Sequence, residues 1–101
     1  MYIYNVTIKV KNEIKTDWLH WLQSEHIPEV LATSCFSSAT ILQLLEVDDS
    51  EGPTYAVQYY AESKANYNLY INKYASLLRD KSYQKWGDRF IAFRSIMQVV
   101  N

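Results

Sequence analysis

Five polar side chains of this 101-residue chain are of types suited to ligand binding or proton transfer. His26 follows two closely spaced tryptophans, and it is the candidate catalytic residue because an imidazole exchanges protons near neutral pH. The alternative is a structural histidine whose ring nitrogens are hydrogen-bonded inside the protein. The candidate ligand-binding residues are Asn5, Gln58, Tyr60 and Arg94.

An arginine beside two amides on an apolar surface is typical of a site for a carboxylate or a planar polar molecule. Arg94 would supply the charge, and Asn5 and Gln58 would supply hydrogen-bond donors and acceptors. The sequence therefore predicts a small anionic or planar ligand. The alternative is that these side chains are solvated or take part in contacts between subunits.

A proline two residues after His26 determines how that histidine is presented. Pro28 has no backbone N–H, and its ring clashes with the preceding helical turn. We therefore expect a helix that begins near Ile14, is interrupted near Ile27 and restarts to about Thr33. Such an interruption would place His26 at a bend on the rim of a pocket.

Alternating and helical patterns divide the whole chain into six elements. Strands are predicted over residues 2–11, 39–47, 54–62 and 90–100, and a first helix runs over 14–33. Ser63 can cap a second helix that Gly87 ends. The order β-α-β-β-α-β predicts one α+β domain over residues 1–101 with a ferredoxin-like fold, in which a four-stranded antiparallel sheet of order 4-1-3-2 carries both helices on one face.

The other face of such a sheet must meet solvent, a ligand or a second subunit. We expect Asn5, Gln58 and Arg94 to form a polar row on this uncovered face, with Phe90, Ile3, Ala92 and Ile96 around it. Together with Tyr60, the side chains of Ile3, Ala92 and Ile96 would form an apolar patch there. A patch of this kind predicts a homodimer. The residues expected under the helices are Tyr4, Val6, Ile8, Tyr55, Val57, Tyr59, Ile91, Phe93 and Met97.

Composition argues against several classes of partner. The net charge is −1 with lysine and arginine spread along the chain, so we expect no binding to nucleic acid or to an anionic membrane. The single cysteine and the lack of a long apolar run predict a cytoplasmic protein. His20 and His26 are six residues apart and belong to no metal-binding motif, so we expect neither a metal site nor a cofactor.

Three motifs carry a resemblance to a known family: YNVT at residues 4–7, EHIPEVLAT at 25–33 and FIAFR at 90–94. The chain resembles an uncharacterised bacterial domain family, which is similar to the dimeric α/β-barrel superfamily. The resemblance implies two ferredoxin-like subunits that face their sheets together, in a superfamily of cofactor-independent monooxygenases, small isomerases and haem-degrading enzymes. Asn5 matches an asparagine of the haem-degrading members, but Tyr70 and the region of Asp80 stand at their tryptophan and histidine positions, so the haem ligand is missing.

Together these observations predict a homodimeric small-molecule-binding protein. A cofactor-independent enzyme, monooxygenase-like or isomerase-like, with its site between the sheet and the dimer partner is the first hypothesis. The alternative is a non-catalytic ligand-sensing or dimerisation module.

Overall fold

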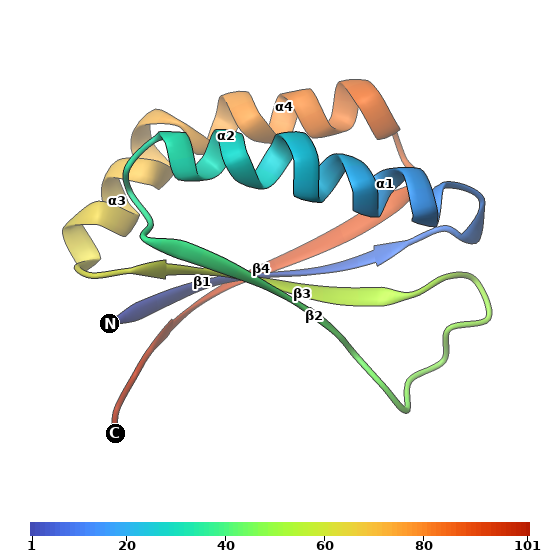
Figure 1. The fold of residues 1–101 in the computed structure, drawn as a ribbon, viewed down its shortest axis with the longest axis horizontal. Helices are drawn as coiled ribbons and strands as arrows, with labels where there is room; N and C mark the ends of the chain where they lie inside the picture. The colour runs from blue at the N-terminus through green and yellow to red at the C-terminus, as the bar shows by residue number, and fades with distance from the viewer.

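The alternating first strand is the centre of the sheet in the computed structural model, which describes all residues from Met1 to Asn101 (Figure 1). Strand β1 (Tyr2–Val10) pairs antiparallel with β3 (Thr54–Ala61) on one side and with β4 (Phe90–Gln98) on the other. Strand β2 (Ser38–Gln43) pairs antiparallel with β3, which gives the order β2-β3-β1-β4. This confirms the predicted ferredoxin-like sheet. All helices lie on one of its faces (Figure 1).

The segment around Pro28 stays helical throughout. A 3-10 turn (Asn12–Ile14) leads into α1 (Lys15–Trp21), which continues through a π-helical turn (Leu22–His26) into α2 (Ile27–Ala32). The predicted interruption near Ile27 therefore exists, but it is a change of helical register and not a helix end. In the π-helical turn the Ile27 N–H donates to the Leu22 carbonyl. Pro28, which has no N–H to donate, stands in the first turn of α2, where helices tolerate proline.

The second helical region consists of two helices where the sequence predicted one. Helix α3 (Lys64–Lys73) ends at Tyr74, whose φ of −118° departs from helical geometry, and α4 (Ala75–Trp86) follows at once. The predicted cap is confirmed, because the Ser63 side chain accepts a 3.1 Å hydrogen bond from the Asn66 N–H. Gly87 ends α4 with a φ of +62°, as a glycine after a helix allows.

The loop between β2 and β3 is fastened to the end of β1. The Val10 N–H donates to the Pro53 carbonyl at 3.0 Å, and the Asn12 N–H donates to the Glu51 carbonyl at 3.0 Å. Between them, Gly52 approaches so closely that a Cβ atom there would lie 1.7 Å from the Val10 carbonyl oxygen. Only glycine fits this position, which also has a φ of +150°.

The hydrophobic core lies between the sheet and the helices. Tyr4, Val6 and Ile8 of β1 and Tyr55, Val57 and Tyr59 of β3 point into it, as predicted. The Trp18 ring stacks on Tyr55 with the ring centroids 5.6 Å apart. The largest side chains that are fully buried are Trp18, Leu22, Val10, Val30 and Val57.

The orientation of β4 is opposite to the prediction. Its register places Phe90 beside Val10 and Arg94 beside Val6, so the even-numbered residues of β4 face the helices. Phe90 is buried, whereas Ile91 is 58% exposed and Phe93 69% exposed on the uncovered face. Consequently the predicted inward positions of Ile91, Phe93 and Met97 are wrong. The predicted outward positions of Phe90, Ala92, Arg94 and Ile96 are wrong for the same reason.

Candidate functional site

A small cavity lies between the sheet and the helices, with a volume of about 40 Å³. This is enough for a few water molecules or for the polar headgroup of a ligand, since one water needs roughly 10 to 15 Å³ by the same measure. Most of its 16 lining residues are apolar or aromatic. The lining side chains that carry a nitrogen or a hydroxyl group are Tyr4, Trp18, Trp21, His26, Tyr59, Tyr70, Arg79, Ser82 and Arg94.

His26 lines this cavity from the end of the π-helical turn. Its ring stacks on Trp21 with the centroids 4.8 Å apart and the planes 25° from parallel. The pKa of His26 is lowered from its ordinary 6.5 to about 4, and burial is the main cause. The negative charge of Glu29 opposes this shift, and the positive charge of Arg94 adds to it. His26 is therefore neutral at pH 7 and offers one nitrogen that donates and one that accepts.

Arg79 enters the cavity from α4 and was not among the predicted site residues. Its Nη2 donates a 3.1 Å hydrogen bond to the Tyr4 hydroxyl. Its Nε is buried and has no hydrogen-bond partner, a state shared in this chain only by Trp86 Nε1 among buried side-chain atoms. A buried donor without a partner is costly, which makes Arg79 Nε a feature that needs a functional explanation.

A sequence signal for Arg79 did exist. Ala75, Leu78, Arg79, Ser82 and Trp86 follow the spacing of one helix face, and every one of them is at least partly buried. An arginine within such a stripe is unusual, because arginine is rarely placed inside without a partner.

Arg94 lies on the same side of the sheet as His26 and Arg79, opposite to its predicted position. It lines the cavity and is also exposed to solvent in the single chain, so it lies at the cavity mouth. The polar row predicted from Asn5, Gln58 and Arg94 does not form, because Arg94 pairs in register with Val6, whereas Asn5 pairs with Ser95. The Arg94 side chain therefore lies on one face of the sheet, and the Asn5 and Gln58 side chains lie on the other.

The other three predicted ligand-binding residues lie on the uncovered face. Gln58 Nε2 donates to Asn5 Oδ1 at 3.3 Å, and Asn5 Nδ2 donates to Thr7 Oγ1 at 3.0 Å. The Tyr60 hydroxyl donates to Thr40 Oγ1 at 3.3 Å. These residues form a neutral hydrogen-bonded band across the middle of the uncovered face.

Two buried tyrosines add hydroxyl donors to the cavity. Burial raises the pKa of Tyr59 and of Tyr70 well above the ordinary value of 10, so both stay protonated at all physiological pH values. Tyr70 also lies close enough to Arg79 and Arg94 for both positive charges to act on its pKa. Both arginines line the same cavity as Tyr70.

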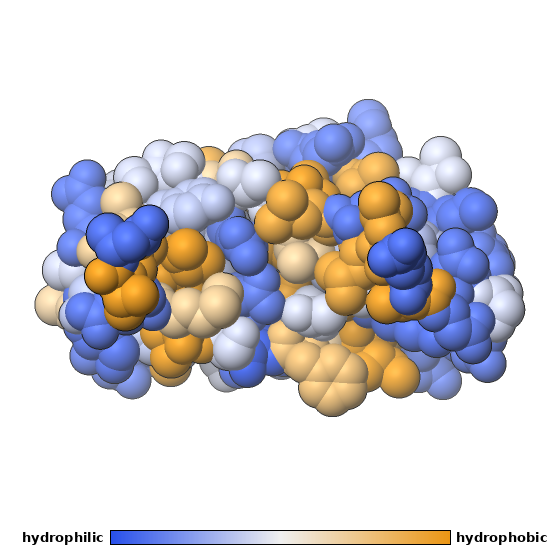
Figure 2. Space-filling view, turned by 90° about the horizontal axis from the view of Figure 1, so that it is seen from below, coloured by the Kyte–Doolittle hydropathy of each residue, from blue (hydrophilic) through white to orange (hydrophobic).

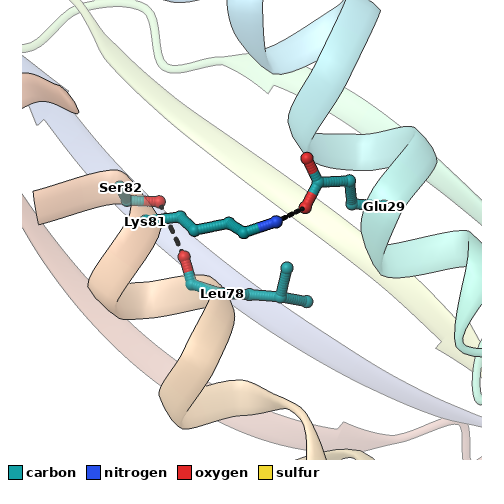
Figure 3. Close-up of polar contacts among 4 residues, drawn as sticks. All are labelled: Glu29, Leu78, Lys81 and Ser82. Carbon is teal, nitrogen blue, oxygen red and sulfur yellow. Dashed lines mark hydrogen bonds and ion pairs between the residues drawn. The ribbon is translucent and has the colours of Figure 1, made fainter. Parts of the chain in front are cut away.

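The single ion pair of the chain lies outside the cavity, on the surface of the helical layer. Lys81 Nζ of α4 donates to Glu29 Oε2 of α2 at 2.9 Å, and both side chains are largely exposed (Figure 3). The pair joins the two helices next to Leu78 and Ser82 (Figure 3), both of which line the cavity. Glu29 thus forms its ion pair with Lys81 and none with either cavity arginine.

A wider depression of about 460 Å³ lies beside α1 and the β2–β3 loop and includes His20. Most of its polar side chains are exposed, as ordinary solvated surface groups are. Nowhere do three or more histidine, cysteine, aspartate or glutamate side chains gather as a metal site would require. No helix has the length and apolar character that crossing a bilayer demands.

Comparison with known proteins assigns this chain to a family. A model of the domain of unknown function DUF4286 matches residues 1–100. The chain belongs to the DUF4286 family. No curated protein matches this DUF4286 domain in sequence.

Solved structures share the fold of this DUF4286 domain at low sequence identity. A dimeric ferredoxin-like protein from an uncultured marine organism aligns with a TM-score of 0.69 at 12% identity, over 99% of this chain and 95% of that chain. An ethyl tert-butyl ether d (ethd) family protein from Bacillus halodurans C-125 aligns with a TM-score of 0.67 at 10% identity, over 99% of this chain and 100% of that chain. A second dimeric ferredoxin-like protein from an uncultured marine organism aligns with a TM-score of 0.65 at 15% identity, over 100% and 96% of the two chains.

Proposed function

We propose that this DUF4286 domain binds a small molecule in the cavity between its sheet and its helices. The observation that carries the proposal is the buried Arg79 Nε, a strong donor that has no partner within the protein. Arg94 at the mouth and neutral His26 on the wall complete a set of polar groups from three different elements. A cavity that is apolar overall, with a few polar groups directed into it, is typical of small-molecule sites.

Within this proposal, a cofactor-independent enzyme is the first hypothesis and His26 is its general base. At pH 7 the ring is neutral and can accept a proton, and its contact with Trp21 fixes its orientation. A pKa of about 4 makes His26 a weak base, so a ligand that raises this pKa is part of the hypothesis.

The alternative is a non-catalytic ligand-sensing or dimerisation module. The small volume of the cavity, about 40 Å³, favours this alternative because it admits only part of a substrate. The two hypotheses differ in one measurable respect: an enzyme converts the bound compound, whereas a sensor releases it unchanged.

The same proposal includes a homodimer formed by the uncovered sheet faces. Figure 2 views this face and shows apolar side chains in two groups with polar residues between them. Its exposed apolar side chains are Leu42, Ile91, Phe93 and Met97, and the related structures from marine organisms are described as dimeric. Light scattering on a sizing column is expected to give twice the mass of one 11.9 kDa chain, and a monomer at micromolar concentration would contradict the dimer.

The test of binding is a thermal-shift screen of a metabolite library against three proteins: wild type, His26→Gln and His20→Gln. His20 is exposed and outside the cavity, so its variant is the matched control. We expect compounds that stabilise wild type and His20→Gln but stabilise His26→Gln less. Ser82→Leu is a further variant, which fills the cavity. Compounds that stabilise His26→Gln and Ser82→Leu as much as they stabilise wild type would contradict the proposed site.

Incubating each hit with the protein and analysing it by mass spectrometry then separates the two hypotheses. Conversion that His26→Gln abolishes favours the enzyme. Binding without conversion favours the sensing module.

Two other expectations stay predictions. One is that the protein does not bind nucleic acid. The other is its cytoplasmic location, for which the free and buried Cys35 is the supporting observation.

A further inference from the structure

Two arginines, Arg79 and Arg94, line the cavity, and no carboxylate side chain lines it with them. The only ion pair of the chain joins Lys81 and Glu29 on the outer surface. A guanidinium group among apolar walls is costly unless an anion accompanies it, so the charge pattern indicates a missing negative partner.

We propose that this partner is the carboxylate group of a small organic acid, held between Arg79 Nε and Arg94, with the remainder of the acid extending through the cavity mouth. The inference rests on the proposed function and assigns the chemical class of its ligand.

The geometry favours a carboxylate headgroup over other anions. A volume of about 40 Å³ admits a flat headgroup but not a complete ligand. Guanidinium N–H groups match the planar carboxylate in pairs, and Arg79 Nε is free for such a bond because only its Nη2 is engaged, by Tyr4. Phosphate sites commonly use the N–H groups of a helix N-terminus, whereas α4 contributes Leu78, Arg79 and Ser82 from within the helix.

The neighbouring tyrosines strengthen the same assignment. Tyr70 lines the cavity together with both arginines, and its hydroxyl stays protonated. It can therefore donate to an anion but cannot itself supply negative charge to the cavity. Tyr59 behaves in the same way.

The test uses two pairs of probes that differ in charge but little in shape: acetate with acetamide, and benzoate with benzamide. Each is titrated calorimetrically into wild type, Arg79→Met and Lys85→Met. Lys85 lies on the same helix as Arg79 and is exposed, so Lys85→Met removes one positive charge outside the cavity. We expect wild type and Lys85→Met to bind at least one carboxylate more tightly than its amide, and Arg79→Met to lose about tenfold or more of that affinity.

Several outcomes separate this inference from the proposed function. Equal binding of the carboxylate and the amide, abolished by Ser82→Leu, would overturn the carboxylate assignment and leave the small-molecule cavity standing. No binding by any probe, together with no Ser82-dependent hit in the metabolite screen, would overturn both.

Two further measurements test the assignment of a carboxylate ligand. Inorganic phosphate that binds as tightly as the best carboxylate would overturn the carboxylate class. If Arg79→Met fails to fold, Arg94→Met replaces it, because Arg94 is exposed at the mouth and its removal leaves the core intact. Carboxylate affinity unchanged by Arg94→Met would then overturn the proposal.

Discussion

The two faces of one sheet differ in where they place charge and apolar surface. The helix-covered face buries aromatic and aliphatic side chains around two arginines and a histidine. The uncovered face exposes Phe93, Ile91 and other apolar side chains around a neutral band that includes Asn5 and Gln58. The covered face thus holds the buried Nε of Arg79 without a partner, and because burying such a group is costly, its presence indicates a function. Apolar surface is concentrated where solvent makes it most costly, which indicates a protein partner.

The largest expected effect concerns the covered face, which should carry the stability of the protomer. Trp18 is 2% exposed and stacks on Tyr55, so Trp18→Ala should lower the free energy of unfolding by about 3 to 5 kcal/mol. Leu77 is 62% exposed on the outer surface of α4, and Leu77→Ala should cost less than about 1 kcal/mol. Urea unfolding measures both, and similar losses for the two variants would contradict the assigned core.

The next effect is a dependence of stability on pH that originates in the cavity. The pKa of His26 is about 4 in the folded protein against 6.5 when it is unperturbed, so between these values the unfolded chain binds the extra proton. The contribution of His26 to stability is therefore complete above pH 6.5 and is lost as the pH falls towards 4, by up to about 3 kcal/mol. Urea unfolding at a series of pH values should show this loss in wild type and in His20→Gln but a smaller one in His26→Gln. Parallel curves for all three proteins would contradict the burial of His26.

A charge on the uncovered face should break assembly but not folding. Phe93 is 69% exposed and central among the apolar side chains of β4, so Phe93→Asp should weaken the dimer by about 2 kcal/mol or more, a factor of about 30 in its dissociation constant. Analytical ultracentrifugation measures this change, and circular dichroism checks that the fold persists. Leu77→Lys places a charge on the helical layer and should leave the dimer intact. If Phe93→Asp and Leu77→Lys raise the dissociation constant of the dimer equally, the uncovered face is not the interface.

The smallest effect is expected from the surface ion pair, which belongs to neither function. Lys81 and Glu29 are 2.9 Å apart but largely exposed. Lys81→Met should therefore change the free energy of unfolding by less than about 1 kcal/mol, and high salt should remove even that difference. A larger loss in thermal or urea unfolding would mean that this pair, and not the core, holds α2 against α4.

The sequence was a reliable guide to the fold where its pattern admits one interpretation. β1 alternates strictly, so the positions of Tyr4 and Val6 followed directly, and the Ser63 cap marks the start of α3. β4 was misoriented because Phe90, Ile91, Ala92 and Phe93 are all apolar, and the pattern fits either face. Only the pairing of β4 with β1 decides between them, and that pairing is a long-range property.

The site was predicted less well than the fold for the same reason. His26 was expected at a bend beside a pocket, and it lies at the end of the π-helical turn that accompanies Pro28. Arg94 was chosen for its chemistry but assigned to the wrong face with the rest of β4. Arg79 was overlooked because arginine is ordinarily a surface residue, although it shares a helix face with Leu78 and Ser82.

The most direct test of the division between the two faces is a crystal structure of the protein grown with a hit from the metabolite screen. We expect the ligand between the sheet and the helices, in contact with Arg79, Arg94 and His26, and two chains packed through the faces that carry Phe93. A ligand bound instead on the uncovered face, against Asn5 and Gln58 between two sheets, would contradict the account.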